Sequence, residues 1–250
     1  MSTLDALFVG AHPDDVELTS GGLAALLASH GHRVGIVDLT RGEAASRGTV
    51  EGRAREAEEA ALALGVASRE CLRLPDLGID RSSREQLVTV VACLRRHRPS
   101  LVVAPDRDDE HPDHVEAAHL IQRACYVSGV ARFEAPGERH RPARLLFSLY
   151  RTGVRPHLVV DVSPSWERRT AALRVHASQL DPARGPSTYL TQPDFMAEVE
   201  ARARHWGALI GATYGEAYRA RGPIGIADAR VLVWGAHVHP GAQGTRGATS

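Results

Sequence analysis

The sequence contains few cysteines, and their spacing excludes two common kinds of structural site. Only three of the 250 residues are cysteine: Cys71, Cys93 and Cys125. They are odd in number, lie far apart and include no Cys-x-x-Cys pair, so neither a disulfide framework nor a thiolate zinc site is indicated. Such a chain suits a reducing compartment, and we expect a cytoplasmic protein.

The chain also lacks net charge and long apolar runs. Thirty basic residues balance thirty acidic ones, so the electrostatic footprint of a nucleic-acid-binding protein is missing. The arginines within Arg95–Arg98 are interpreted as a solvated helix end. No apolar run approaches the roughly 18–20 residues of a membrane span, and the first residues do not resemble a secretion signal. We expect no nucleic-acid partner and no membrane association.

The composition is that of an ordinary globular protein. Hydrophobic residues make up 43% of the chain and charged residues 24%, which is enough apolar material for a sizeable core. A length of 250 residues suits one large α/β domain. We predict a single domain over residues 1–240. Residues 241–250 are small, polar and rich in glycine, and we expect them to form a flexible C-terminal tail.

Short apolar runs alternate with longer segments of helical spacing. The runs have the length of β-strands and occur at Leu4–Val9, Val34–Leu39, Cys71–Leu74, Leu101–Ala104, Leu145–Leu149 and Leu158–Val162. The longer segments favour helices and occur at Gly22–Ser29, Gly52–Leu64, Ser83–His97 and Asp113–Val127. After Pro164 the pattern changes, with helices expected at Trp166–His176 and Asp194–Ile210.

This alternation predicts an α/β fold, with a Rossmann-like three-layer αβα architecture and a mostly parallel sheet. Strands of such a sheet are buried on both faces and read as continuous apolar runs. Ligands bind beyond the carboxyl ends of the strands. The loop Asp181–Pro193 is expected to border that pocket, and Ile226–Trp234 is expected to form a late strand or an oligomer contact.

Two clusters of histidine and aspartate follow apolar runs. The first, Ala11–Glu17, reads Ala-His-Pro-Asp-Asp-Val-Glu and comes directly after Leu4–Val9. The second, His111–His114, reads His-Pro-Asp-His and follows Leu101–Ala104. Carboxylates at the end of a buried strand need a partner, which is often a cation or a metal ion. Because both clusters lie where strands end, they predict one shared metal site.

The two clusters contain the ligands that a catalytic metal ion needs. His12, Asp15 and His114 supply two imidazoles and one carboxylate. Three such ligands with a position left for water are typical of catalytic zinc. The same set also suits Fe(II). We therefore predict a zinc site and keep iron as the alternative metal.

The remaining cluster residues are available for acid–base chemistry. Asp14 adjoins a predicted ligand and is a candidate general base. His111 precedes His114 by three residues, so one helical turn presents both on one face, where His111 could stabilise an oxyanion. Asp113 could hold the tautomer of His111. Either cluster alone is more often a turn, with Asp113 as a helix N-cap, but their combination favours the metal site.

A dinucleotide-binding domain is the alternative interpretation of this fold. Its Gly-rich phosphate loop should follow the first strand, but His12–Asp15 stands there and Gly21–Gly22 comes too late. Carboxylates at that place would repel a pyrophosphate. The pattern therefore favours a Rossmann-like fold with a different site.

The chain resembles the zinc-dependent N-acetylglucosamine deacetylases of the LmbE/PIG-L type. Ala11–Glu17 and His111–His114 match the two signatures of that family, and the likeness extends over most of the chain. Other segments resemble the branch that makes bacillithiol, which removes acetate from N-acetylglucosaminyl malate. These segments are Asp38–Thr40, Gly48–Val50 with Arg53 and Glu56, Leu74–Asp76 with Gly78, Ser178–Gln179, and Tyr214–Ala217.

The resemblance implies a hydrolytic deacetylase acting on a small amino-sugar substrate, and relatives suggest a homotrimer or homohexamer. It also implies a role for each motif residue. By this resemblance, His12, Asp15 and His114 are the metal ligands, and Asp14 is the general base. His111 stabilises the oxyanion, with Asp113 as its orienting partner. Arg53 binds the sugar. Alternatively, Arg53 is an exposed helix residue paired with Glu56 or Glu58.

Two positions depart from the bacillithiol branch. Glu110 stands where a basic residue is expected, and the tyrosine expected near Phe195 is missing, although Tyr189 could replace it. An acidic Glu110 disfavours a malate carboxylate unless an arginine compensates. The candidates are Arg107, Arg151 and Arg184. Other functions therefore stay open, namely deacetylation of an inositol-linked or chitin-derived conjugate, or metal-dependent sugar binding without catalysis.

Overall fold

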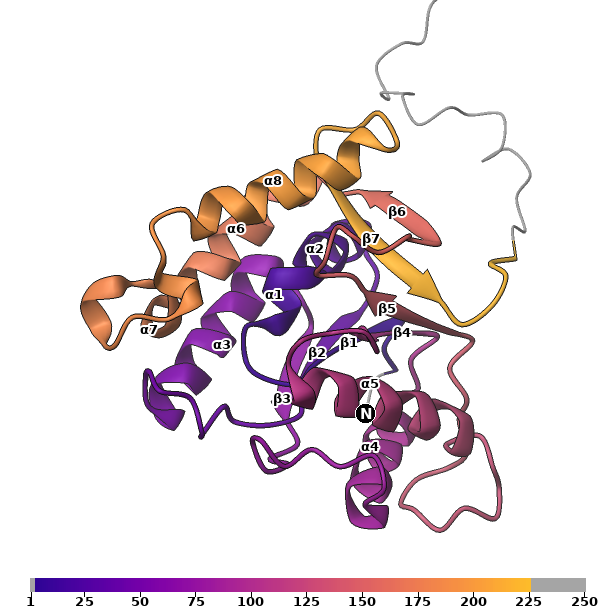
Figure 1. Ribbon diagram of the computed structural model, residues 1–250. Coiled ribbons are helices and arrows are strands. Elements are labelled where there is room, and N and C mark those ends of the chain that lie inside the picture. Colours follow the sequence, from indigo (N-terminus) through magenta and orange to yellow (C-terminus); the bar gives the residue numbers. More distant parts are fainter. Residues whose placement is uncertain (1–2, 226–250) are drawn as a thin grey trace, which may run out of the picture.

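A seven-stranded mixed sheet runs through the part of the chain that the computed structural model describes, residues 3–225 (Figure 1). The strand order is β3-β2-β1-β4-β5-β7-β6, in which β1 to β5 are parallel and β7 is antiparallel to both of its neighbours. The strands are β1 (Ala6–Gly10), β2 (Val34–Asp38), β3 (Ser68–Cys71), β4 (Leu101–Pro105), β5 (Arg144–Ser148), β6 (Leu158–Asp161) and β7 (Gly215–Ala220). The predicted mostly parallel α/β sheet is confirmed.

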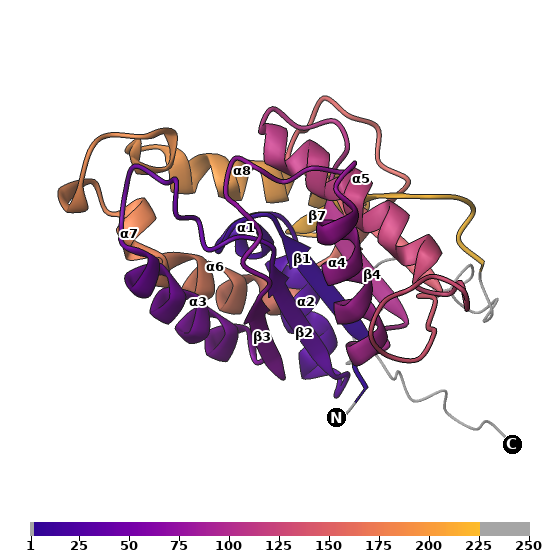
Figure 2. The same ribbon diagram turned by 90° about the horizontal axis from the view of Figure 1, so that it is seen from below.

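Helices cover both faces of this sheet (Figure 2). One apolar core joins the sheet to α4 and α5, and a second joins the opposite face to α2, α3 and α6. The helices are α1 (Asp15–Thr19), α2 (Gly21–Ser29), α3 (Val50–Leu64), α4 (Arg84–His97), α5 (Pro112–Val127), α6 (Trp166–Val175), α7 (Ala177–Leu180) and α8 (Phe195–Ala208). None of these described helices has the length and apolar character that a bilayer-spanning segment needs.

Several elements differ from the sequence-based expectation, and helix α7 and strand β7 were not predicted at all. Strand β3 ends at Cys71, whereas the apolar run predicted a strand over Cys71–Leu74. Arg73 adopts a φ of 57°, which a strand cannot accommodate, so the chain turns inside the predicted run. The single-turn helix α1 was not predicted, because five residues are too short to show helical periodicity. The predicted strand or contact at Ile226–Trp234 and the tail at 241–250 lie outside the described residues.

The interpretation of Arg95 as part of a solvated helix end was wrong. Its side chain lies at the end of α4 but is only 5% exposed. The guanidinium donates hydrogen bonds to five backbone carbonyls of the segment that follows α5, between residues 128 and 137. A charge can be buried in this way because the carbonyl groups replace its water. Arg95 therefore fixes the path of this loop against α4.

A buried cluster of charged side chains lies next to the first His/Asp motif. Arg69 pairs bidentately with Asp38, at 2.8 and 2.9 Å, and its Nη1 lies 2.5 Å from Glu17 Oε1. His176 Nε2 lies 3.4 Å from the same Glu17 oxygen, and both side chains are fully buried. Burial opposes ionisation of Glu17, but Arg69 and His176 outweigh it and lower its pKa to about 2.

Replacement Glu17→Gln is expected to destabilise the fold by about 3–5 kcal/mol, because it removes the buried carboxylate charge that Arg69 and His176 share. The pKa of Glu17 lies below its ordinary value of 4.5, so the charged form stabilises the protein above pH 4.5 and this contribution is lost as the pH falls toward 2. Urea unfolding at pH 7 and pH 3 measures it. The difference in unfolding free energy between wild type and Glu17→Gln should be smaller at pH 3 than at pH 7. Glu59→Gln, at an exposed position of α3, should leave the unfolding free energy unchanged at both pH values. An equal gap at both pH values would contradict the explanation.

Candidate active site

The two predicted motifs meet at the carboxyl end of the sheet. Strands β1 and β4 are neighbours, and the first motif follows β1 while the second opens α5 directly after the loop that leaves β4. The chain doubles back tightly after Gly10, where a Cβ would lie 2.9 Å from the carbonyl oxygen of His12 and 3.1 Å from Cβ of Asp15. Glycine at this position therefore allows the first motif to fold back tightly on the end of β1.

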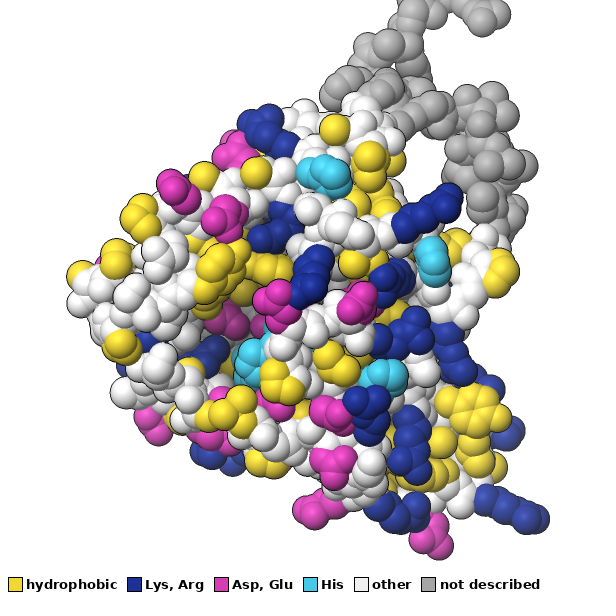
Figure 3. All heavy atoms as spheres, in the orientation of Figure 1, with side chains coloured by type: hydrophobic (Ala, Val, Ile, Leu, Met, Phe, Trp, Pro, Cys, Tyr) yellow, Lys and Arg dark blue, Asp and Glu magenta, His cyan; other side chains and the backbone are white. Residues whose placement is uncertain are grey.

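A cavity of about 510 Å³ contains both motifs. Its walls include His12, Asp14, Asp15, His111 and His114. Figure 3 shows a hollow on this face in which acidic and histidine side chains gather. The cavity lies beyond the carboxyl ends of the parallel strands, where open α/β sheets bind their ligands.

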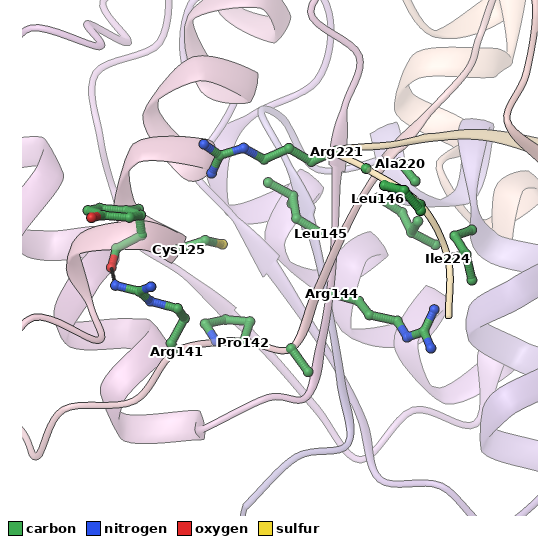
Figure 4. A pocket seen from close by; sticks show the side chains of 13 residues that line it. Cys125, Arg141, Pro142, Arg144, Leu145, Leu146, Ala220, Arg221 and Ile224 are labelled. Carbon is green, nitrogen blue, oxygen red and sulfur yellow. Dashed lines mark hydrogen bonds between the residues drawn. The ribbon is translucent and has the colours of Figure 1, made fainter. Parts of the chain in front are cut away.

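A second cavity of about 460 Å³ lies at the opposite end of β5 (Figure 4). Three arginines, Arg141, Arg144 and Arg221, line it together with apolar side chains, and its described lining includes neither histidine nor carboxylate. In Figure 4 the side chains of Arg144 and Arg221 extend in opposite directions. This cavity therefore lacks the groups for acid–base chemistry, and the active-site candidate is the cavity that holds the two motifs.

The predicted metal ligands His12, Asp15 and His114 lie together. One oxygen of Asp15 is 3.5 Å from Nδ1 of His12, and its other oxygen is 3.3 Å from Nε2 of His114. In a tetrahedral zinc site with bonds of 2.0–2.1 Å, neighbouring ligand atoms stand roughly 3.4 Å apart. Each of the two nitrogen–oxygen spacings lies near that value, and each involves a different oxygen of Asp15.

The outward nitrogens of both histidines face further carboxylates. Nε2 of His12 lies 3.3 Å from Asp76 and 3.3 Å from Asp113, and Nδ1 of His114 lies 3.2 Å from Asp109. A carboxylate that accepts the outer N–H of an imidazole leaves the inner nitrogen free for a metal ion. For the neutral rings, these carboxylates favour the tautomers that leave Nδ1 of His12 and Nε2 of His114 free.

The carboxylates also explain the proton affinity of the two imidazoles. Burial lowers the pKa of His12, but Asp15 and Asp14 outweigh it and raise the value to about 9. The pKa of His114 is raised well above its ordinary value, because Asp15 and Asp109 outweigh burial in the same way. The site therefore attracts positive charge strongly, whether it is supplied by protons or by a metal ion.

The prediction for Asp113 needs a correction. Its carboxylate was expected to orient His111, but one of its oxygens lies 3.3 Å from His12 and accepts the backbone N–H of Leu77 at 2.8 Å. The contact with His111 comes instead from the backbone N–H of Asp113, which lies 3.3 Å from Nδ1 of the His111 ring. His111 is consequently the N-cap of α5, the position expected for Asp113 if the motif were only a turn.

This backbone contact determines which nitrogen of His111 carries the proton. Burial, together with His114 and His12, lowers the pKa of His111 below its ordinary value, so the ring is neutral at pH 7. Because Nδ1 accepts a hydrogen bond, the proton of the neutral ring resides on Nε2. His111 can therefore donate a hydrogen bond from Nε2 to an oxygen in the cavity.

Asp14 is held in an unusual backbone conformation, with φ 129° and ψ −22°. Few non-glycine residues adopt such angles, and outliers of this kind are concentrated at functional sites. The carboxyl group is almost fully buried, and burial raises its pKa, while Arg53 opposes that rise. A carboxylate with a raised pKa is a stronger base than one in water.

The alternative interpretation of Arg53 as an exposed helix residue was wrong. The side chain is 4% exposed and lines the cavity from α3. Its guanidinium donates to the carbonyl of Pro13 at 2.9 Å and to that of Gly42 at 3.1 Å, and lies 3.4 Å from Asp14. Arg53 therefore supports the strained turn that carries Asp14. Its contact with a sugar hydroxyl stays a prediction.

The rim of the cavity includes the other two predicted substrate contacts. Glu110 forms an ion pair with Arg151, one of the three arginines proposed to compensate its charge. Tyr189 lies in the loop that was predicted to border the pocket, and this prediction is confirmed. The Tyr189 ring packs edge-to-face on Phe195, and its hydroxyl donates to Glu198 at 2.5 Å. Tyr189 thus occupies the surroundings in which a phenol was expected.

Two carboxylates of the site were not assigned from the sequence. Asp76 follows an edge strand, and Asp109 precedes the second motif by two residues. Each looks like an ordinary acidic loop residue, since the sequence does not say which loops meet. Both residues follow predicted strands, as the two motifs do, and this position in the sequence could have marked them as candidates.

Comparison with known proteins agrees with this site. The family model described as GlcNAc-PI de-N-acetylase, PIG-L, matches residues 7–125. The chain is 32% identical to the diacetylchitobiose deacetylase of Thermococcus kodakarensis, covering 69% of each chain. It is 30% identical to the 1D-myo-inositol 2-acetamido-2-deoxy-alpha-D-glucopyranoside deacetylase of Saccharomonospora viridis, covering 70% of this chain and 84% of the relative. It is also 29% identical to the 4-oxalmesaconate hydratase of Pseudomonas putida, covering 70% and 73%.

A solved structure is similar over nearly the whole fold. The conserved protein TT1542 from Thermus thermophilus superimposes with a TM-score of 0.82 and 35% identity, covering 90% of this chain and 97% of the other. The family match spans both His/Asp motifs. The chain therefore belongs to the PIG-L family of deacetylases, to which the LmbE-type proteins also belong.

Proposed function

We propose that the protein is a metal-dependent hydrolase that removes the acetyl group from an N-acetylglucosaminyl conjugate. The observation that carries this proposal is that two adjacent aspartates make different contacts in the same cavity. Asp15 faces the inner nitrogens of His12 and His114 at the spacing of metal ligands, while Asp14 lines the same cavity and pairs with Arg53 instead. Metal-dependent amide hydrolysis uses a bound cation together with a separate base.

Zinc is the proposed metal, with Fe(II) as the alternative that the same three ligands allow. His12, Asp15 and His114 would hold the ion. When bound there, it supplies Lewis acidity toward water and toward the acetamide oxygen. Asp76, Asp109 and Asp113 keep the outer ring nitrogens engaged, so the inner nitrogens stay directed at the ion.

Asp14 is proposed to move the proton in both halves of the reaction. Its carboxylate accepts a proton from the water that attacks the acetamide carbon. The protonated carboxyl then delivers this proton to the amine nitrogen as the carbon–nitrogen bond breaks, and acetate and a free amine result. A raised pKa suits both steps, because the group must accept and release a proton near neutral pH.

His111 is proposed to stabilise the negative charge that develops on the acetamide oxygen. The neutral ring carries its proton on Nε2, since Nδ1 accepts the backbone N–H of Asp113. A donor already directed into the cavity stabilises the transition state without reorganising at the moment of reaction. Asp113 contributes to this arrangement through its backbone, and through its carboxylate it orients His12.

The conjugated group is proposed from the rim residues. N-acetylglucosaminyl malate, the bacillithiol precursor, is the substrate that the resemblance predicts. A malate carboxylate would have to compete with Glu110 for Arg151. A neutral inositol or chitin-derived group would leave that ion pair intact, and these are the substrates in the names of two relatives. Arg53 and Tyr189 remain proposed contacts for the sugar. Homo-oligomeric assembly and cytoplasmic location stay predictions from the sequence.

A hydratase is the second candidate function, favoured by the similarity to a 4-oxalmesaconate hydratase. Addition of water to a carbon–carbon double bond also needs an activated water and a base, and the same residues could provide them. Hydration releases no acetate, which separates the two reactions experimentally. A sugar-binding protein without catalysis would need neither Asp14 nor the donor on His111.

Acetate release from a panel of conjugates tests the proposal. The panel contains N-acetylglucosaminyl malate, an inositol-linked N-acetylglucosamine and diacetylchitobiose, each incubated with zinc-loaded and iron-loaded protein. We expect acetate from at least one of them. Glu110→Gln should raise the rate on the malate conjugate relative to the inositol conjugate, because Arg151 is then free for the carboxylate. If folded, metal-loaded protein releases acetate from none, the deacetylase proposal is rejected, and loss of a double-bond absorbance with 4-oxalmesaconate would support the hydratase.

A further inference from the structure

A second group of metal-ligating side chains lies away from the active site, between helix α4 and the edge strand β3. Glu70, Cys93 and His97 each offer one ligand atom, and these atoms all lie within 4.8 Å of one another. Cys93 and His97 are four residues apart on α4, so they share one face of the helix. Glu70 reaches them from β3.

Three protonated side chains converge on Oε1 of Glu70. Nε2 of His97 lies 2.7 Å from Oε1, and the thiol of Cys93 donates to the same oxygen at 3.3 Å. Arg96 contacts both carboxylate oxygens, at 2.6 and 2.8 Å. The proton on His97 Nε2 and the proton on Cys93 Sγ both lie on the side of Glu70 Oε1. A cation bound by these three atoms would take the place of the two protons.

The chemistry of this group suits a zinc-like ion. A thiolate, an imidazole and a carboxylate are all established ligands of Zn²⁺, and Co²⁺ accepts the same set. Glu70 can ligate through Oε1 and keep Arg96 on Oε2, so the guanidinium does not have to leave the cluster. Side chains of Glu70 and His97 are 34% and 17% exposed, which gives an ion access from solvent, while Cys93 forms the buried end.

We propose that Glu70, Cys93 and His97 form a second metal site, which takes one divalent ion of the zinc type. On binding, the thiol of Cys93 releases its proton to solvent and the sulfur forms a bond to the ion. His97 binds the ion through Nε2 as a neutral ring with its proton on Nδ1, so an imidazolium loses the Nε2 proton to solvent, and a neutral Nε2–H ring moves its proton to Nδ1 by exchange with water. Arg96 balances part of the added negative charge. The ion would cross-link the exposed edge strand β3 to α4, in a part of the fold that takes no part in the proposed hydrolysis.

Cobalt titration tests this site separately from the active site. A sulfur-to-cobalt charge-transfer absorption in the near ultraviolet arises only when a cysteine ligates the ion, and the proposed active-site ligands contain no sulfur. We expect this absorption to saturate at one equivalent per chain, and to disappear in Cys93→Ser. His97→Gln, at a more exposed position, should weaken cobalt binding at this site by at least about 10-fold, since even indirect partners of a metal ion have effects of that size.

Cys125→Ser is the matched control, because Cys125 is also a buried cysteine in a helix and lies outside the cluster. It should keep the absorption in full. Circular dichroism of each variant checks folding, and His97→Gln still tests the site if Cys93→Ser fails to fold. Absence of the absorption at saturating cobalt would overturn the proposal. Its persistence in a folded Cys93→Ser protein would overturn it as well, by assigning the sulfur to another cysteine.

Discussion

Replacement Asp14→Asn is expected to lower the rate of acetate release by about 10²–10⁴-fold, while the folded protein still binds one zinc ion at the active site. The amide of asparagine cannot accept the proton of the attacking water, so the whole contribution of the base is lost. A loss of this size corresponds to about 3–5 kcal/mol of transition-state stabilisation. Asparagine is also among the residues that tolerate positive φ best, so the turn at φ 129° should persist.

The measurement is kcat on the best substrate of the panel, together with the zinc content of the dialysed protein. Asp108→Asn serves as the control, because Asp108 lies on an exposed loop near the second motif and its charge is not used in the proposed chemistry. It should retain a near-normal rate. A near-normal rate in Asp14→Asn would remove Asp14 from the role of base. Loss of zinc together with activity would instead make Asp14 part of the ligand set.

The meeting of the two motifs could be predicted from the sequence, because each candidate group belongs to one of two short motifs. Each motif follows a buried apolar strand, and parallel strands end at one edge of the sheet, so adjacency of the motifs follows from the fold class. His12, Asp14 and His114 accordingly line one cavity. The positions of β1 and β2 were recognisable because both strands are buried along their whole length.

What the sequence did not predict are the contacts between loops and side chains from distant segments. Asp113 was assigned to His111 because they are neighbours in sequence, but its carboxylate reaches His12, about a hundred residues earlier. Asp76 reaches the same ring from the loop after β3. Arg95 was interpreted as solvated because the carbonyls that bury it belong to an irregular loop. Such contacts depend on loop paths, which carry no periodic signal.

The partners of buried charged residues were likewise not predictable from the sequence. His176 lies singly in the sequence, and the sequence could not decide whether it is a surface or a core residue. In the structure it is fully buried beside Glu17, and it contributes to the electrostatic environment of Asp14. The partner of an isolated histidine becomes visible only when α6 is packed against α1. Pattern recognition therefore identified the candidate site residues, and the supporting charges came from the structure.

Replacement Asp15→Ala is expected to remove the zinc ion and, with it, detectable deacetylation. Asp15 is the one carboxylate between the inner nitrogens of His12 and His114, and it also accepts the backbone N–H of His12 at 2.8 Å. Its loss removes the carboxylate ligand that lies next to both imidazoles. Zinc content after dialysis and the rate of acetate release measure the effect.

A graded series makes this prediction specific to the proposed ligand set. Asp109→Asn removes only the outer partner of His114 and should weaken zinc binding by about 10–100-fold, a smaller loss than that in Asp15→Ala. The alternative ligand set consists of three imidazoles, since those of His12, His111 and His114 offer atoms that all lie within 4.8 Å of one another. If Asp15→Ala keeps its zinc ion while His111→Ala loses it, this alternative set is correct, and His111 cannot serve as the free donor to the oxyanion.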